Sequence, residues 1–228
     1  MSGAPKLPTS FRRALADTRR SLRSSLHRLG RLNRAWDAPV PEQNLVLHFG
    51  AALLRSDHAV YGEADLPGRG RIDLLACSRR AGLLVEAASF GGVKMSKIME
   101  DARRLEKYLP QAPWPLVSGK DGGAFWSELD QRWALILVSC SSTRHFFDCW
   151  SGLLDTRRLG ARLASEACDF VPGFPGHARE EMRRFGAFLS KRQGLGGCLP
   201  VIKQDRKEKL FAGEILPISI LWAAWRLP

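Results

Sequence analysis

Three carboxylates stand in segments whose other residues are typical of a protein core. Asp73 lies within the run R-I-D-L-L-A and Glu86 within the run L-L-V-E-A-A, each among apolar neighbours. Glu42 precedes Leu45 and Val46 by three and four residues, so on a helix it would project from the buried face. A buried, ionised carboxylate destabilises the fold unless a cation, a hydrogen-bond donor or a second acid meets it.

These acids favour cation binding. A hairpin joining the two apolar runs would place Asp73 beside Glu86, and two adjacent carboxylates repel each other. A divalent metal held by oxygen ligands is the usual way to relieve that repulsion, and Glu42 could supply a third oxygen. The alternative is that Asp73 and Glu86 form buried ion pairs with Arg71 or Arg103.

The surrounding pattern predicts the elements that must position these side chains. A short amphipathic helix begins at Pro41, because proline suits a first helical turn and the apolar residues that follow recur at helical spacing. Turn-forming residues then separate three strand-like runs. The expected strands cover 59–66, 71–78 and 82–90.

The second half of the chain continues the alternation of helix and strand. Residues 133–140 are apolar throughout, which indicates an interior strand with both faces covered. The order helix, three strands, helix, strand predicts a mixed α/β domain. The remaining expected elements are helices over 93–109, 146–167 and 177–192, a Gly-rich break at 194–197, and a last strand within 215–225.

This arrangement resembles the PD-(D/E)XK nuclease superfamily. The resemblance is carried by Glu42 on a helix, the strand I-D-L-L-A, a turn, and the strand L-L-V-E-x-x, with twelve residues between Asp73 and Glu86. It covers roughly residues 41–140. It implies an α/β, restriction-endonuclease-like fold, with a mixed sheet flanked by helices. It also implies that Glu42, Asp73 and Glu86 hold Mg²⁺ or Mn²⁺ and that the substrate is a phosphodiester.

One position departs from the family pattern. Where the resemblance expects a lysine two residues after Glu86, the chain has Ala88. In the first interpretation the lysine has migrated to Lys94, which precedes Ile98 by four residues on the inward face of the second helix, with Lys97 as a weaker candidate. Asp73, Glu86 and Lys94 would then be the catalytic residues. In the second interpretation the protein binds nucleic acid without cutting it.

The charge of the chain points to a polyanionic partner. It has 35 Lys and Arg against 23 Asp and Glu, a formal net charge of +12. Such a field favours nucleic acid, DNA more than RNA; an anionic membrane surface or a merely solvated basic surface is the alternative. The expected nucleic-acid contacts are Arg12, Arg13, Arg19, Arg20, Arg71, Lys97, Arg103 and Arg104.

Residues 1–37 form a basic helical arm. Phe11, Leu15, Leu22 and Leu26 recur at helical spacing, with Leu29 and Leu32 continuing the stripe, and arginines occupy the other faces. Either the stripe packs on the body, or the helix pairs with a protein partner or with a phosphate backbone. Residues 38–228 would form the nuclease-like domain.

Several other classes of protein find no support in the sequence. The five cysteines form no C-x-x-C pair, and neither a P-loop nor a nucleophile elbow occurs. No apolar run is long enough to span a bilayer, so a cytoplasmic protein is expected, although the Arg-rich N-terminus would also suit a transit peptide. The function expected first is a metal-dependent DNA nuclease. The alternatives are a catalytically silent nucleic-acid-binding subunit and a protein-interaction module.

Overall fold

Six described strands form one mixed sheet, in the order β1-β2-β3-β4-β6-β5. The computed structural model describes residues 6–32, 40–66, 70–89, 95–107, 129–141, 176–202 and 218–228. The strands are β1 (Ala59–Leu66), β2 (Gly70–Cys77), β3 (Ala81–Ser89), β4 (Gln131–Ser141), β5 (Leu195–Ile202) and β6 (Ile218–Arg226). Strands β3 and β4 pair in parallel, and the other described neighbours pair antiparallel.

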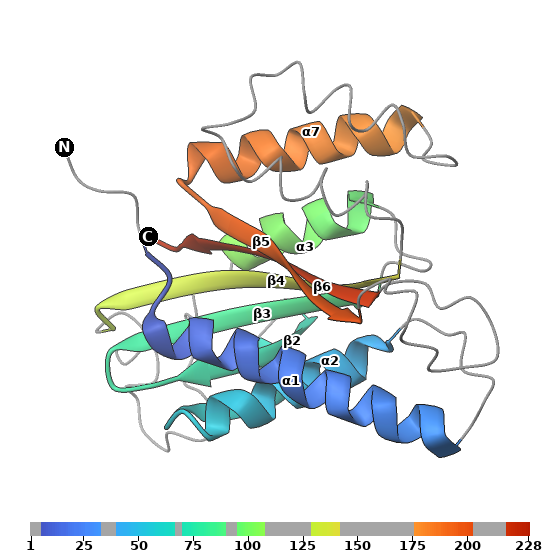
Figure 1. Cartoon of the computed structure of the whole chain (residues 1–228). Coiled ribbons are helices and arrows are strands. Elements are labelled where there is room, and N and C mark those ends of the chain that lie inside the picture. Colours follow the sequence, from blue (N-terminus) through green and yellow to red (C-terminus); the bar gives the residue numbers. More distant parts are fainter. Residues whose placement is uncertain are drawn as a thin grey trace.

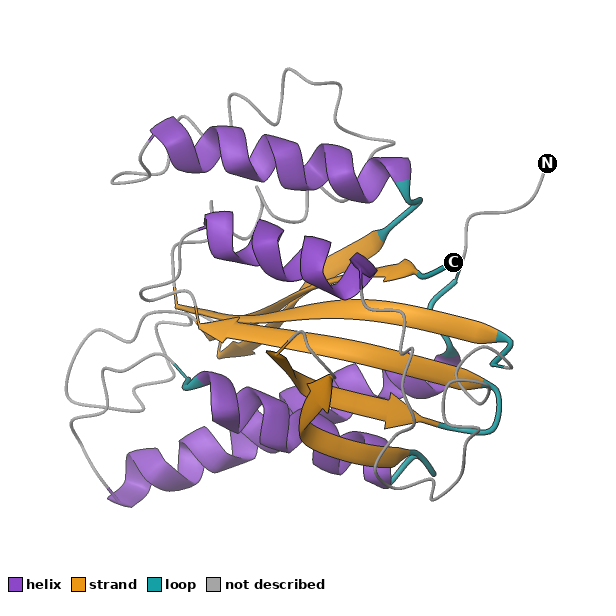
Figure 2. Ribbon diagram, turned by 180° about the vertical axis from the view of Figure 1, so that it is seen from behind, coloured by secondary structure: helices purple, strands orange, loops and turns teal. Residues whose placement is uncertain are grey.

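Helices cover both faces of this sheet, which gives three layers (Figures 1 and 2). Helices α1 (Thr9–Leu32) and α2 (Glu42–Leu54) lie on one face. Helices α3 (Met95–Lys107) and α7 (Gly176–Lys191) lie on the other. The mixed α/β architecture predicted from the sequence is therefore confirmed.

Strand β4 lies at the centre of the core. Trp133, Leu135 and Leu137 pack into the layer of α1 and α2, whereas Ala134 and Ile136 pack into the layer of α3 and α7. Both faces of the strand are therefore buried, as its unbroken apolar run predicted. The local predictions for α2, β1, β2, β3, α3, β4, α7 and β6 agree with the structure to within three residues at each end. The helix expected over 146–167 lies outside the described residues.

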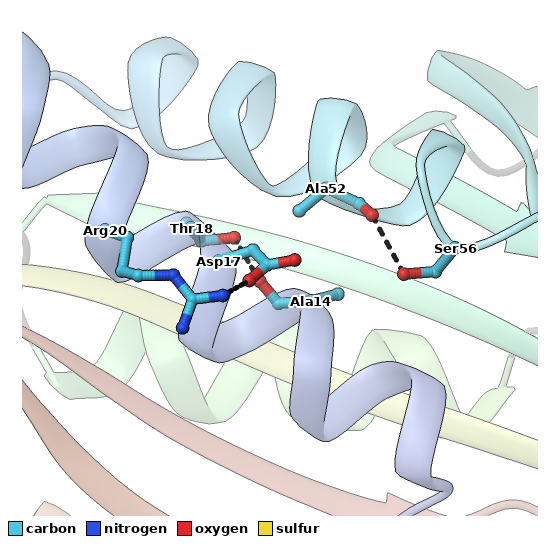
Figure 3. A network of polar contacts seen from close by, with 6 residues as sticks. All are labelled: Ala14, Asp17, Thr18, Arg20, Ala52 and Ser56. Carbon is cyan, nitrogen blue, oxygen red and sulfur yellow. Dashed lines mark hydrogen bonds and ion pairs between the residues drawn. The ribbon is translucent and has the colours of Figure 1, made fainter.

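The apolar stripe of α1 packs on the body of the protein. Phe11, Leu15, Leu22 and Leu26 are buried in the same cluster as residues of α2, β3 and β4. Within the helix, the Thr18 hydroxyl donates to the Ala14 carbonyl at 2.7 Å, so this polar side chain is satisfied inside the buried face (Figure 3). Of the two arrangements left open for the basic helix, docking on the body is the one observed.

The Gly-rich break expected at 194–197 is shorter in the structure, because it ends at Gly194 and residues 195–197 already belong to strand β5. Gly197 pairs with Trp222 of β6, and a Cβ on Gly197 would come within 3.1 Å of the indole Nε1. The missing side chain thus leaves room for the indole. Glycine is unfavourable in an isolated strand, so the pairing with β6 outweighs the local preference.

Two contacts set the position of α2 against the sheet. The Ser139 hydroxyl of β4 donates to the carbonyl of Val40 at 2.7 Å, just before the helix begins. Farther along, Gly50 faces Leu74 of β2 so closely that a Cβ would lie 3.1 Å from the Leu74 Cδ1 atom. The first contact ties the start of α2 to β4, and the second brings a later turn of α2 against β2. No helix in the described part of the chain is long and apolar enough to cross a membrane.

Candidate functional site

The sheet opens between β2 and β3 at two of the predicted acids. The two strands pair from Cys77 with Gly82 as far as Leu74 with Val85, whereas β3 stays paired with β4 as far as Ser89. The next residues along the ladder are Asp73 and Glu86. The β2–β3 pairing therefore ends where the acids begin.

The Asp73 carboxylate takes over the hydrogen bonding at this opening. The backbone N–H of Ala87 donates to Asp73 Oδ2 at 2.6 Å. A side-chain oxygen thus satisfies a backbone donor that regular pairing would have satisfied. This interaction orients the carboxylate in the gap between the two strands.

Glu86 is buried and forms an ion pair with an arginine of α3. Its carboxylate Oε1 lies 2.6 Å from Arg104 Nη2, and the same nitrogen lies 3.1 Å from Asp101 Oδ1. Glu86 and Asp101 are both buried, so Arg104 bridges two acids inside the protein. Ion pairing had been considered with Arg71 or Arg103, but the arginine that the structure brings to Glu86 is Arg104. Arg71 instead lies 3.4 Å from Glu63.

Four acids thus form an acidic centre: Glu42 from α2, Asp73 from β2, Glu86 from β3 and Asp101 from α3. Burial raises the pKa of Glu86 to about 8, and the charge of Asp73 adds to the rise while Arg104 opposes it. Burial also raises the pKa of Glu42, with a further contribution from Asp73. The pKa of Asp101 is raised for the same first reason, against the lowering effect of Arg104 and Lys97. The cations nearby do not fully compensate the acids.

A cavity of about 400 Å³ opens beside this centre, between α2 and strands β1 and β2. Glu42 and Asp73 both line it, together with apolar side chains such as Val46 and Leu74. The predicted convergence on one cleft therefore holds for Glu42 and Asp73. It does not hold for Glu86, which is not among the residues that line the cavity and instead meets Arg104 of α3.

The acidic centre suits an open magnesium site better than a closed cage. Among the residues described, no three His, Cys, Asp or Glu side chains lie close enough together to hold one metal ion. Mg²⁺ is, however, often bound through one or two carboxylates, with water and substrate phosphate completing the shell. Asp73 and Glu86, at adjoining positions of neighbouring strands, fit that kind of site in donor type and number.

Lys94 and Lys97 were the two candidates to replace the lysine that the family pattern expects at residue 88. Lys94 lies outside the described residues. Lys97 is exposed on α3, and its charge lowers the pKa values of Glu42 and Asp101, so it lies within electrostatic range of the centre. Ala88 is only 1% exposed and packs in the apolar cluster beneath α3.

Sequence reasoning missed Asp101. The signal was present, because Asp101 lies three residues after Ile98 and four before Leu105, both on the buried face of α3. Asp101 thus has the same feature as Glu42, a carboxylate on the buried face of an amphipathic helix. Arg104 had been predicted only as a nucleic-acid contact.

The predicted basic contacts of α1 divide into two groups. Arg12, Arg13 and Arg20 are exposed, and Arg20 forms an ion pair with Asp17 one turn earlier (Figure 3). Arg19 instead donates from Nε to the carbonyl of Pro200 at 2.7 Å and so ties α1 to β5. The exposed arginines place positive charge on the side of α1 that faces solvent.

The chain was compared with protein-family models, with curated proteins and with solved structures, and none of the three comparisons finds a match.

Proposed function

We propose that this protein is a metal-dependent nuclease that hydrolyses DNA phosphodiesters at the acidic centre. The observation that supports this most is the opening of β2 and β3 at Asp73 and Glu86. Acids whose pKa values are raised by burial and by one another are typical of functional sites. A fold maintained for stability alone has no need to collect four carboxyl groups in one place.

The proposed roles of the side chains follow from their positions. Asp73 and Glu86 would hold Mg²⁺ or Mn²⁺, with Glu42 approaching from the cavity side. When bound, such an ion polarises the phosphate and lowers the pKa of its water. The Ala87 N–H keeps the Asp73 carboxylate oriented toward the gap. Exposed arginines of α1 would bind phosphates along the DNA backbone and place the duplex on the protein.

A second function has its own supporting observation. Glu86 is already paired with Arg104, and Ala88 stands where the family pattern has a lysine. Both features suit a protein with a nuclease-like fold that binds nucleic acid, or a protein partner, without cutting. Metal-dependent cleavage separates this candidate from the first.

Substitution of Asp73 tests the proposed nuclease. Supercoiled, linear and single-stranded DNA, and RNA, are incubated with purified protein in Mg²⁺, in Mn²⁺ or in EDTA. We expect cleavage of DNA only with a metal, and we expect Asp73→Asn to abolish it, because the substitution removes a charged oxygen ligand while leaving an acceptor for the Ala87 N–H. DNA binding should persist or strengthen, since the substitution removes one negative charge near the phosphate.

Two further variants control this experiment. Asp57→Asn changes an exposed aspartate just past the other end of α2 and should cleave like the wild type; Asp57 has a φ of 61°, which asparagine tolerates as well. Ala88→Lys restores the family pattern. If neither the wild type nor Ala88→Lys cuts any substrate with either metal, the nuclease proposal is wrong and the non-cutting candidate remains.

A further inference from the structure

Arg104 has an unusual position for a buried ion-pair partner. Its side chain is 36% exposed, whereas those of Glu86 and Asp101 are 3% and 6% exposed. Its Nη2 atom reaches Glu86 at 2.6 Å and Asp101 at 3.1 Å. One end of the arginine is therefore anchored among buried acids while part of it stays accessible from solvent.

Arg104 contacts Glu86, the acid that the lysine of the family pattern would follow by two residues. Ala88 lies two residues after Glu86 on the same face of β3, in the apolar cluster that contains Ile98 and Ala102 of α3. Helix α3 therefore covers the space into which a side chain at residue 88 would extend. The same helix sends Arg104 to Glu86, so a cation reaches this acid from the helix and not from the strand.

A phosphate needs such a cation here, because the ionised acids of the centre would otherwise repel it. A guanidinium stays charged at any physiological pH and matches phosphate oxygens with paired N–H donors. Contact with two buried acids, Glu86 and Asp101, also holds the long side chain in place before the ligand arrives, which reduces the entropic cost of binding.

We propose that Arg104 is the phosphate-binding cation of the acidic centre, held by Glu86 and Asp101, in place of the lysine that the chain lacks at residue 88. The proposal rests on the proposed function, since the phosphate is that of the DNA backbone. Arg104 cannot accept a proton from water, so its role is to bind and orient phosphate.

The test compares Arg104→Gln with Arg226→Gln. Arg226 is an exposed arginine on β6, and its backbone pairs with that of Trp133, three residues before Ile136, the residue of β4 that is in register with Glu86. The dissociation constant of a duplex DNA oligonucleotide is measured at several salt concentrations, in EDTA and in Ca²⁺. Arg104→Gln should reduce the slope of log affinity against log salt by about 0.9, the value for one neutralised phosphate. It should also weaken binding by roughly tenfold at low salt.

Melting temperatures separate binding from folding. Arg104→Gln also leaves two buried acids without this ion pair, so its melting temperature should fall; a purely structural role would lower it without changing the salt slope. If Arg104→Gln does not fold, Arg104→Lys keeps the charge but removes the planar guanidinium. It should retain the wild-type slope with several-fold weaker binding.

The outcomes distinguish this inference from the proposed function. Equal slopes and affinities for Arg104→Gln and Arg226→Gln, or wild-type affinity for Arg104→Lys, would overturn the role of Arg104 whatever the cleavage assay finds. Lack of cleavage by both the wild type and Ala88→Lys would overturn the nuclease proposal and leave the binding result for Arg104 standing. Lack of DNA binding by the wild type at low salt would overturn both.

Discussion

Burial, repulsion by neighbouring acids and pairing with an arginine all act on the ionisation of Glu86. Asp73 faces it from β2, and Asp101 and Arg104 face it from α3. Burial and the two acids favour the protonated form, and they outweigh Arg104, because the pKa of Glu86 rises to about 8. A divalent cation at this point would reverse the balance by favouring the ionised carboxylate.

This pKa predicts how stability changes with pH. Because the pKa is higher in the folded state, the native protein retains the proton between about pH 4.5 and 8 while the unfolded chain releases it. Stability should therefore fall as the pH rises through this window, and level off above it. Thermal denaturation in EDTA from pH 5 to pH 9 measures the effect.

Glu86→Gln should flatten this dependence, because glutamine does not titrate. Its melting temperature should fall less than that of the wild type between pH 5 and pH 9. Parallel curves for the two proteins would contradict the raised pKa of Glu86. Glu42 and Asp101 also have raised pKa values, so some decline in stability should persist in the variant.

At the scale of the element, one face of α1 packs on the body of the protein and the other carries exposed arginines. Its apolar stripe is buried against α2 and the sheet, and Arg19 ties it to β5. Its remaining arginines include Arg12 and Arg13, which are exposed. Deleting the helix would remove both the buried stripe and the positive charge, so substitution on the exposed face is the cleaner test of DNA binding.

The double variant Arg12→Gln/Arg13→Gln should weaken DNA binding and reduce its dependence on salt. For every phosphate that the variant no longer neutralises, the slope of log affinity against log salt should fall by about 0.9. The matched control is Arg79→Gln/Arg80→Gln, an exposed pair in the turn between β2 and β3. Equal changes in the two double variants would mean that α1 contributes only to the overall charge.

At the scale of the whole molecule, both core layers are built from segments far apart in the chain. Phe11 of α1 is fully buried in the same cluster as Leu135 of β4 and Ile220 of β6. The two layers share the strands of one sheet, and β4 contributes side chains to both. The N-terminal helix is thus part of the core as well as a carrier of charge.

Removal of residues 1–37 should therefore prevent cooperative folding of 38–228. Phe11→Ala should lower the free energy of unfolding by about 3–5 kcal/mol, the usual cost of emptying a buried phenylalanine site. Chemical denaturation followed by circular dichroism measures both. A truncated chain that unfolds in one sharp transition at the wild-type midpoint would instead show that α1 is an independent arm.

The sequence by itself determined most of the local structure and the first three acids. Hydrophobic period and turn residues are local properties, so they were sufficient to place α2, β1, β2 and β3 near their observed ends. The unbroken apolar run of β4 likewise indicated its central place. Glu42, Asp73 and Glu86 stood out because a carboxylate among apolar neighbours is costly wherever the chain folds.

Only the tertiary structure decided which groups meet. The pairing of Glu86 with Arg104 joins β3 to a helix on one face of the sheet, and the bond from Arg19 to Pro200 joins residues 181 positions apart. Strand β5 also depends on a contact between distant segments, since Gly197 becomes a strand residue only through its pairing with β6. Local patterns report which face of an element is buried, but the partner across that face is set by the packing of distant segments, which no single stretch of sequence contains.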